Sequence, residues 1–347
     1  MTTGSQTAVS SATATEQEQT TDQPDEPEFP MGLSENGATQ LLYSAHVQAL
    51  LQTSFHVEWS KLDLTNSELR WQKEYQADVG QALGSWTRQN GGPVRIFRQG
   101  SEAYWREELG DRTTYGKDNE GFQIGKVAWS VEIQKLLEAF SWGAPELVSE
   151  SPAVWQIEAT GIETPSAVPG HMEGEVLDLT AGAMTVTAGG VIRTSEATYK
   201  VRRLDGQELR VSSQYTVDSL GEVTVDAPSW LPTARENAPT IEASLTDDRR
   251  FVRFEVVAGN RLEPGSRITV FADDQQTKTV VPLEQALEPG VVAYLYRDGE
   301  MATGVARGRI ERGSVPSDVS PAPFEKSYNV TAFRTTNNYC ERVPVSE

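Results

Sequence analysis

Residues 54–79 read SFHVEWSKLDLTNSELRWQKEYQADV, and this stretch decides the fold of the first half of the chain. Phe55, Val57 and Trp59 alternate with polar residues, and the same alternation returns after a polar turn. Successive side chains of a β-strand point to opposite faces of its sheet. The stretch therefore predicts two antiparallel strands with one apolar face and one solvated face.

Strand patterning continues along the chain and is interrupted by two segments with helical periodicity. Residues 31–52 and 126–142 repeat apolar side chains at spacings of three and four, which predicts amphipathic helices. A curved antiparallel sheet with both helices against its concave face buries both apolar stripes. The expected fold class is therefore α+β or mainly β, a curved half-barrel with covering helices.

A second strand-rich block begins near RENAPT, residues 235–240. Its short strands recur about every ten residues with turns between them, which is typical of a small β-sandwich of immunoglobulin type. The cysteine pair of true immunoglobulin domains is missing, because the chain has one cysteine, Cys340. The predicted organisation is a disordered tether over residues 1–31, a half-barrel over 32–234 and an immunoglobulin-like sandwich over 235–347.

The predicted tether consists mainly of Thr, Ser, Gln, Glu, Asp, Pro and Ala, and the first basic residue of the chain is Lys61. Such a composition buries too little apolar surface to offset chain entropy, so we expect disorder. The segment lacks the basic start and the apolar run of a secretory signal. No run in the chain approaches the roughly eighteen apolar residues of a membrane-spanning helix.

The chain is strongly acidic, with 50 acidic and 30 basic residues and a net charge of −20. Binding to nucleic acid requires clustered Lys and Arg, so this balance argues against a nucleic-acid partner. An acidic, lysine-poor surface is typical of proteins from very salty environments, where salt screens the self-repulsion. An ordinary acidic soluble protein is the alternative.

The order of helices and strands over residues 32–234 resembles the LolA/LolB-like lipoprotein-carrier fold, an unclosed barrel whose helices cover an apolar cavity. GLSENG at 32–37, before a helix ending in SAHVQALLQTSF, is similar to the opening of a family of haloarchaeal surface lipoproteins. AGGVIRTSEATY at 188–199 is similar to a strand, turn and strand of that family.

In that family a lipid-bearing cysteine precedes a tether rich in Ser, Thr and acidic residues, and Met1 stands here at the position of that cysteine. The resemblance implies an extracytoplasmic cell-surface protein, held to the membrane by an N-terminal lipid anchor that is absent from this sequence. An expression leader or an ordinary disordered terminus is the alternative for the tail.

The sequence contains no motif of a nucleotide-binding loop, a serine hydrolase or a zinc protease. We therefore expect no enzyme activity, no cofactor and no metal site. His46 and His56 are interpreted as surface or structural histidines. His171 has Glu173 and Glu175 nearby, but a solvated loop is the favoured interpretation.

Aromatic residues concentrate in the predicted half-barrel, which holds all eight tryptophans. They form either a conventional filled core or the wall of a cavity for an apolar ligand, in which each buried methylene contributes about 0.8 kcal/mol. The predicted cavity wall comprises Phe55, Val57, Trp59, Leu69, Trp71 and Tyr75. The predicted lid comprises Trp129, Ile133, Leu136, Leu137 and Phe140.

The predicted function is binding of a lipid, or of the acyl chain of a lipoprotein, with release when the helices swing off the sheet. The alternative is a structural or adhesive surface module that has a solid core and contacts other envelope proteins. One sequon, Asn329-Val330-Thr331, predicts glycosylation of Asn329 in an exported protein.

Overall fold

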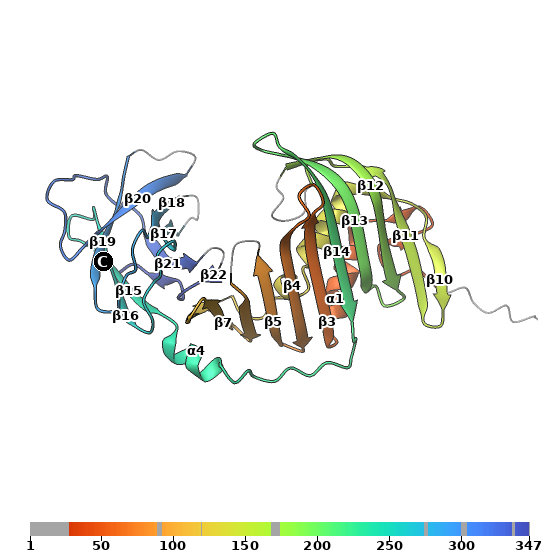
Figure 1. The fold of residues 1–347 in the computed structure, drawn as a ribbon, viewed down its shortest axis with the longest axis horizontal. Helices are drawn as coiled ribbons and strands as arrows, with labels where there is room; N and C mark the ends of the chain where they lie inside the picture. The colour runs from red at the N-terminus through yellow and green to blue at the C-terminus, as the bar shows by residue number, and fades with distance from the viewer. Residues whose placement is uncertain are drawn as a thin grey trace, which may run out of the picture.

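The structure is a computed structural model that describes residues 28–88, 92–118, 120–167, 174–273, 277–299, 304–334 and 337–346. Within this part of the chain the fold is mainly β, with two large sheets and four helices. Figure 1 shows each sheet in a lobe of its own. The expectation of a mainly β chain built on a large, curved antiparallel sheet is confirmed.

The first lobe is a 12-stranded antiparallel sheet within the described residues. Its strands in chain order are β3 (Phe55–Asp63), β4 (Glu68–Asp78), β5 (Gln81–Arg88), β6 (Val94–Gln99), β7 (Glu102–Leu109), β8 (Arg112–Asp118), β9 (Phe140–Trp142), β10 (Glu146–Glu150), β11 (Ala153–Ile162), β12 (Gly174–Thr187), β13 (Ile192–Arg203) and β14 (Glu208–Asp218). The spatial order is β10-β11-β12-β13-β14-β3-β4-β5-β6-β7-β8, with β9 beside β11. The pairing of β14 with β3 therefore joins the last strand of the lobe to the first large one.

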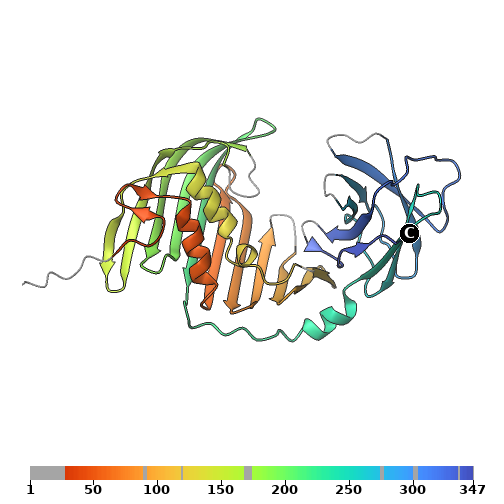
Figure 2. The same cartoon turned by 180° about the vertical axis from the view of Figure 1, so that it is seen from behind.

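Helices α1 (Leu41–Leu50) and α3 (Ser130–Ala139) lie across the inner face of this sheet, next to the short α2 (Ile124–Val127). Figure 2 shows α1 and α3 side by side in front of the strands. The first helix is shorter than the sequence predicts, because part of its expected range forms the hairpin of β1 (Leu33–Ser34) and β2 (Gly37–Ala38).

The glycines of GLSENG have a structural role in that hairpin. Gly32 and Gly37 have φ angles of +86° and +108°, which favour glycine. A Cβ at Gly37 would lie 2.1 Å from the backbone oxygen of Trp142. The motif therefore allows the hairpin to approach the backbone at the end of β9 closely.

The second predicted helix, 126–142, is broken at Trp129. This residue has a left-handed backbone with a φ of 50°, which separates α2 from α3. Residues Phe140–Trp142 are extended and pair with β11. Helical periodicity identified the apolar stripe correctly but could not show these two ends, because contacts with the sheet determine them.

Two glycines let aromatic rings lie flat on the inner face. Gly84 is directly opposite Tyr75, and Gly116 is directly opposite Trp105. A Cβ at Gly84 would lie 2.3 Å from the Tyr75 ring, and one at Gly116 would lie 2.3 Å from the Trp105 ring. Such aromatic–glycine pairs bring a ring down onto the backbone of the neighbouring strand and accompany sheet curvature.

The second lobe is a nine-stranded unit within the described residues. Its strands are β15 (Thr240–Leu245), β16 (Val252–Ala258), β17 (Arg267–Ala272), β18 (Lys278–Pro282), β19 (Val292–Arg297), β20 (Val305–Arg312), β21 (Tyr328–Arg334), β22 (Asn337–Asn338) and β23 (Val343–Pro344). Strand β20 pairs antiparallel with β19 and parallel with β18, so the strands form one continuous path. The all-β character is confirmed, and the immunoglobulin-like arrangement is not established.

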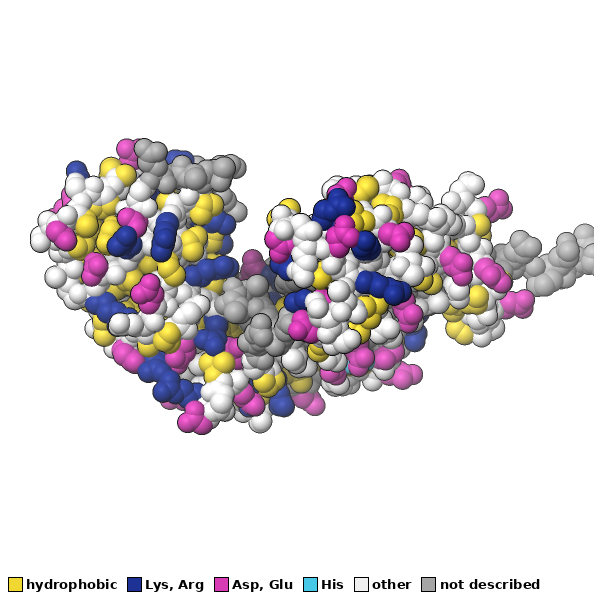
Figure 3. Space-filling model, turned by 45° about the horizontal axis from the view of Figure 1, so that its top comes forward, with side chains coloured by type: hydrophobic (Ala, Val, Ile, Leu, Met, Phe, Trp, Pro, Cys, Tyr) yellow, Lys and Arg dark blue, Asp and Glu magenta, His cyan; other side chains and the backbone are white. Residues whose placement is uncertain are grey.

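The two lobes touch through the edge strand β8 and its neighbour β7. The backbone N–H of Lys117 donates to the oxygen of Tyr339 at 3.0 Å, and the Tyr339 ring lies 5.3 Å from that of Trp105. Arg334 forms an ion pair with Glu107. Elsewhere a notch separates the lobes, and acidic side chains are scattered over both (Figure 3).

Helix α4 (Leu231–Asn237) follows the first lobe and packs on β7 and β8, and Trp230 just before it joins Leu231 in a small apolar cluster with Phe97 and Tyr104. The expected boundary at residues 234–235 falls inside this helix, and the division into domains stays a prediction. Residues 1–27 of the expected tether and His171 lie outside the described residues. No helix in the described part of the chain is long and apolar enough to cross a membrane.

We predict that Gly84→Ala lowers the free energy of unfolding by about 1–3 kcal/mol, because the new methyl group overlaps the Tyr75 ring. Gly161→Ala in β11 is the matched control, since a Cβ there meets no atom within 4 Å. Urea denaturation of both variants checks this. Equal stability of the two would contradict the packing of Tyr75 on Gly84.

Candidate functional site

Five of the six predicted wall residues lie buried on the inner face of β3 and β4: Phe55, Val57, Trp59, Trp71 and Tyr75. Leu69 does not join them. It lies at the start of β4, beside the bulge in the β3–β4 register, and is 36% exposed. Strand alternation alone placed it on the wall, and its position at the end of the strand explains the difference.

The predicted lid residues come together on and beside α3. Ile133, Leu136 and Leu137 lie buried on the helix, and Phe140 is buried at its C-terminal end. Trp129 stands at its N-terminal end, half-buried and with the left-handed backbone described above. Residues other than glycine rarely adopt that backbone conformation, and it persists only where surrounding contacts hold it.

The wall and the lid are in direct contact. The Trp129 ring stacks on Trp59 with centroids 5.1 Å apart and meets the edge of Trp71 at 5.8 Å. Trp71 in turn stacks on Trp86 of β5 at 6.5 Å. These four tryptophans form an aromatic layer between the sheet and the first turn of α3.

Two lysines point into this apolar interior, and the sequence analysis missed both. Lys61 follows Phe55, Val57 and Trp59 at a spacing of two, and Lys73 lies between Trp71 and Tyr75 in the same way. Their exposed fractions are 0% and 7%. The period of two points to the inner face for both residues, but the sequence analysis did not place them there because lysine is rarely buried without a partner.

Lys73 lies inside a cage of aromatic rings. Its Nζ is 3.8 Å from the centroid of Trp129 and 5.1 Å from the centroids of both Tyr75 and Trp86. Cross-strand pairing sets this geometry, because Lys73 is directly opposite Trp59 on β3 and Trp86 on β5. An ammonium group over several ring faces is favourable, and more so when water is excluded.

Lys61 forms an ion pair with Glu132 of α3, with Nζ and Oε2 3.5 Å apart, and both side chains are almost fully buried. Burial lowers the pKa of Lys61 to about 8, although the carboxylate of Glu132 opposes the shift. Burial also raises the pKa of the Tyr199 phenol, and the nearby Glu132 raises it further. The ion pair of Lys61 and Glu132 therefore connects α3 to the inner face of β3.

Several buried polar atoms at this interface have no hydrogen-bond partner in the described structure. They are Nε1 of Trp59, Nε1 of Trp129, Oγ of Ser130 and the hydroxyl of Tyr199. Each such group costs about 1–3 kcal/mol if it is left unsatisfied. The indole nitrogens are donors only, so a group that satisfied them would supply acceptor oxygens.

His46 is a satisfied structural residue, as expected. Its Nδ1 accepts the backbone N–H of Ile192, so Nε2 carries the proton and donates to the hydroxyl of Tyr215 at 3.1 Å. Burial lowers the pKa of His46 to about 3, which keeps the ring neutral.

Asn329 lies on β21 between β17 and β23, and its Nδ2 donates to Asp273 Oδ1 at 2.7 Å. Neighbouring strands pair with it on both sides, so it is not at a sheet edge. Glycosylation of Asn329 stays a prediction. Cys340 is buried, and burial raises the pKa of its thiol to about 12, which does not suit a nucleophile.

No protein family and no curated protein matches the chain. Solved structures with some likeness include the Mycobacterium tuberculosis lipoprotein LppX, at 15% identity and a TM-score of 0.30, covering 55% of this chain and 97% of LppX. MucB is 10% identical with a TM-score of 0.24, covering 76% of this chain and 82% of MucB. The Pseudomonas aeruginosa MucA/MucB complex gives 12% identity and a TM-score of 0.26, covering 89% and 99%. At these scores the likeness carries no argument about this chain.

The buried pair predicts a specific pH dependence. Between pH 8 and the ordinary pKa of 10.5, the unfolded chain keeps the Lys61 proton that the folded chain releases, so stability rises with pH. Between pH 8 and 9.5 the free energy of unfolding should gain up to about 2 kcal/mol from this group. The double variant Lys61→Met/Glu132→Leu should lose that gain in urea denaturation.

Lys278→Met, at an exposed position on β18, is the control and should keep the rise. A double variant whose pH profile matches that of the wild type would show that Lys61 does not titrate in this way.

Proposed function

We propose that the chain is a non-catalytic binding protein that takes an amphiphile, a lipid or the acyl chain of a lipoprotein, between the inner face of the first sheet and α3. The observation that carries this proposal is the pair of buried indole nitrogens of Trp59 and Trp129, which have no hydrogen-bond partner in the described structure and lie beside Lys73 in the cluster of four tryptophans. A bare apolar core does not need such groups, and they weaken it.

The polar end of the ligand is defined by what these groups require. The nitrogens of Trp59 and Trp129 donate hydrogen bonds, and Lys73 contributes a positive charge at the same place. A carboxylate, phosphate or ester oxygen satisfies both requirements. Charge-assisted hydrogen bonds in a site shielded from water are the stronger ones.

The apolar part of the ligand is placed along the lid. Ile133, Leu136 and Leu137 present an apolar stripe of α3 to the sheet, and Phe140 continues it. Because wall and lid touch, entry requires α3 to move. Trp129 is the natural hinge, since its backbone already separates α2 from α3 and its ring is half-buried.

A surface interaction module with a solid core is the second candidate. The close ring contacts favour it, because tryptophan rings with centroids 5.1 and 5.8 Å apart fill space as a packed core does. In that case the lobes contact other envelope proteins.

We also propose a fold type for each lobe: the first is a half-barrel of the lipoprotein-carrier type and the second is an immunoglobulin-like unit. The protein that contains them is an extracytoplasmic surface protein of the haloarchaeal type, and a lipid anchor holds it to the membrane. The net charge of −20 supports a high-salt environment.

The test is mass spectrometry of an organic extract of the protein, purified in high salt from a host that makes its natural lipids. We expect a lipid in near-stoichiometric amount from the wild type and from Lys278→Met. Lys73→Met keeps most of the side-chain volume but removes the charge, so the amount of lipid should fall at least tenfold. Circular dichroism confirms that each variant is folded.

A lipid-free extract from folded wild-type protein would favour the solid interaction module. Equal lipid content in Lys73→Met and the wild type would remove Lys73 from the site.

A further inference from the structure

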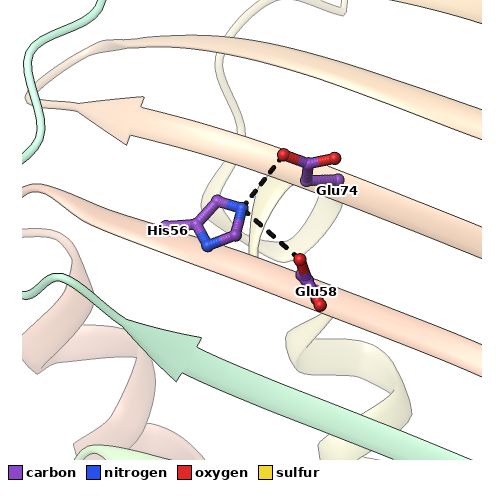
Figure 4. Close-up of side chains that lie close together, drawn as sticks. All are labelled: His56, Glu58 and Glu74. Carbon is purple, nitrogen blue, oxygen red and sulfur yellow. Dashed lines mark hydrogen bonds and ion pairs between the residues drawn. The ribbon is translucent and has the colours of Figure 1, made fainter.

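The outer face of the same sheet carries a second cluster, built from His56, Glu58 and Glu74 (Figure 4). These residues alternate with the inward-facing residues of β3 and β4, so their side chains lie on the far side of the sheet from α3. His56 Nε2 is 3.1 Å from Oε1 of Glu74 and 4.0 Å from Oε1 of Glu58. One ligand atom from each residue lies within 4.8 Å of the others.

The position of the two glutamates favours a positive group between them. Glu58 and Glu74 are directly opposite each other on neighbouring antiparallel strands. Like charges in that arrangement destabilise a sheet, and the net charge of −20 adds to the cost. Within the described residues, His56 is the one Lys, Arg or His side chain with a nitrogen within 4.0 Å of a carboxylate oxygen of either glutamate.

A fourth residue fixes the orientation of the imidazole. Asp218 of β14 is paired directly with His56 in the strand register, and its Oδ1 lies 3.0 Å from Nδ1 of the ring. The hydroxyl of Ser219 donates to the same oxygen at 2.9 Å. A histidine that binds a metal usually donates its other N–H to a carboxylate in this way, which leaves the second nitrogen as the ligand atom.

We propose that His56, Glu58 and Glu74 bind a divalent first-row metal ion such as Zn²⁺ or Mn²⁺. Ligand atoms on one ion with bonds of about 2.0–2.2 Å lie about 3.0–3.5 Å from each other. The separation between His56 and Glu74 already has this value, and Glu58, whose side chain is 61% exposed, needs only a rotation. One imidazole and two carboxylates suit these ions, and the exposed side leaves room for water ligands.

The site lies beside the junction at which the first and last large strands of the first lobe pair. His56 and Asp218 are 162 residues apart, and they lie on the pair of strands, β3 and β14, that joins the two ends of the first lobe. An ion held by β3 and β4, with His56 oriented from β14, binds the folded chain and not the unfolded one, so it stabilises the lobe. The site therefore acts independently of any ligand under α3.

The test is isothermal titration of the full chain with Zn²⁺ at pH 7.5 in high salt, with thermal unfolding in parallel. We expect one Zn²⁺ per chain and a rise in Tm on addition of the ion. His56→Gln should bind at least fifty-fold more weakly and lose the rise in Tm. Asp218→Asn, which disturbs only the orientation of His56, should bind about tenfold more weakly.

Glu196→Gln is the matched control, because it removes one exposed carboxylate from the outer face of β13, which is separated from β3 by β14. It should bind Zn²⁺ within twofold of the wild type. Absence of Zn²⁺ binding to the folded wild type, or unchanged binding by His56→Gln, would overturn the proposal.

Discussion

The stacking of Trp129 on Trp59 is the contact on which the first lobe depends. It fixes the start of α3 on the inner face of β3 and holds the left-handed backbone that separates α2 from α3. The buried ion pair between Glu132 and Lys61 lies one turn further along the same helix. Aromatic packing and charge together therefore set the position of the lid over the sheet.

Charge in this interior is costly, and that cost bears on function. A buried ion pair is often no more stabilising than apolar side chains of the same volume. Stability alone therefore does not explain why charged groups are buried in this interior. Lys73 in its aromatic cage and the indole nitrogens without partners give another reason, because together they offer charge and donors to an incoming acceptor. The same alternation of strands β3 and β4 places His56 and Glu74 on the opposite face. One pair of strands thus carries both of the proposed sites.

Much of the first lobe could be predicted from alternation and helical periodicity. The strands around Trp59 and Trp71 and the apolar stripe of α3 follow from spacing alone, because spacing decides which face each residue occupies. The break at Trp129 could not be predicted, since contacts with the sheet override local helical preference there. The same limit explains Leu69, whose exposure depends on where β4 begins.

The buried lysines mark a different limit. The spacing of Lys61 and Lys73 fits the inner face, but only the structure shows the partners that make their burial possible. Lys61 has Glu132 of α3, and Lys73 has the rings of Tyr75 on β4, Trp86 on β5 and Trp129. Likewise, His56 meets Asp218 only because β14 returns to pair with β3. Chemistry that depends on residues far apart in the sequence is what pattern reading could not provide.

The most direct test of the account is amide hydrogen exchange on the folded chain with and without dodecanoate, a simple amphiphile with a carboxylate head. Protection of the amides in Ser130–Ala139 should change on addition of the amphiphile, while those of β15 to β23 should not. Unchanged exchange over α3, at a dodecanoate concentration that leaves the protein folded, would contradict a binding site beneath this helix.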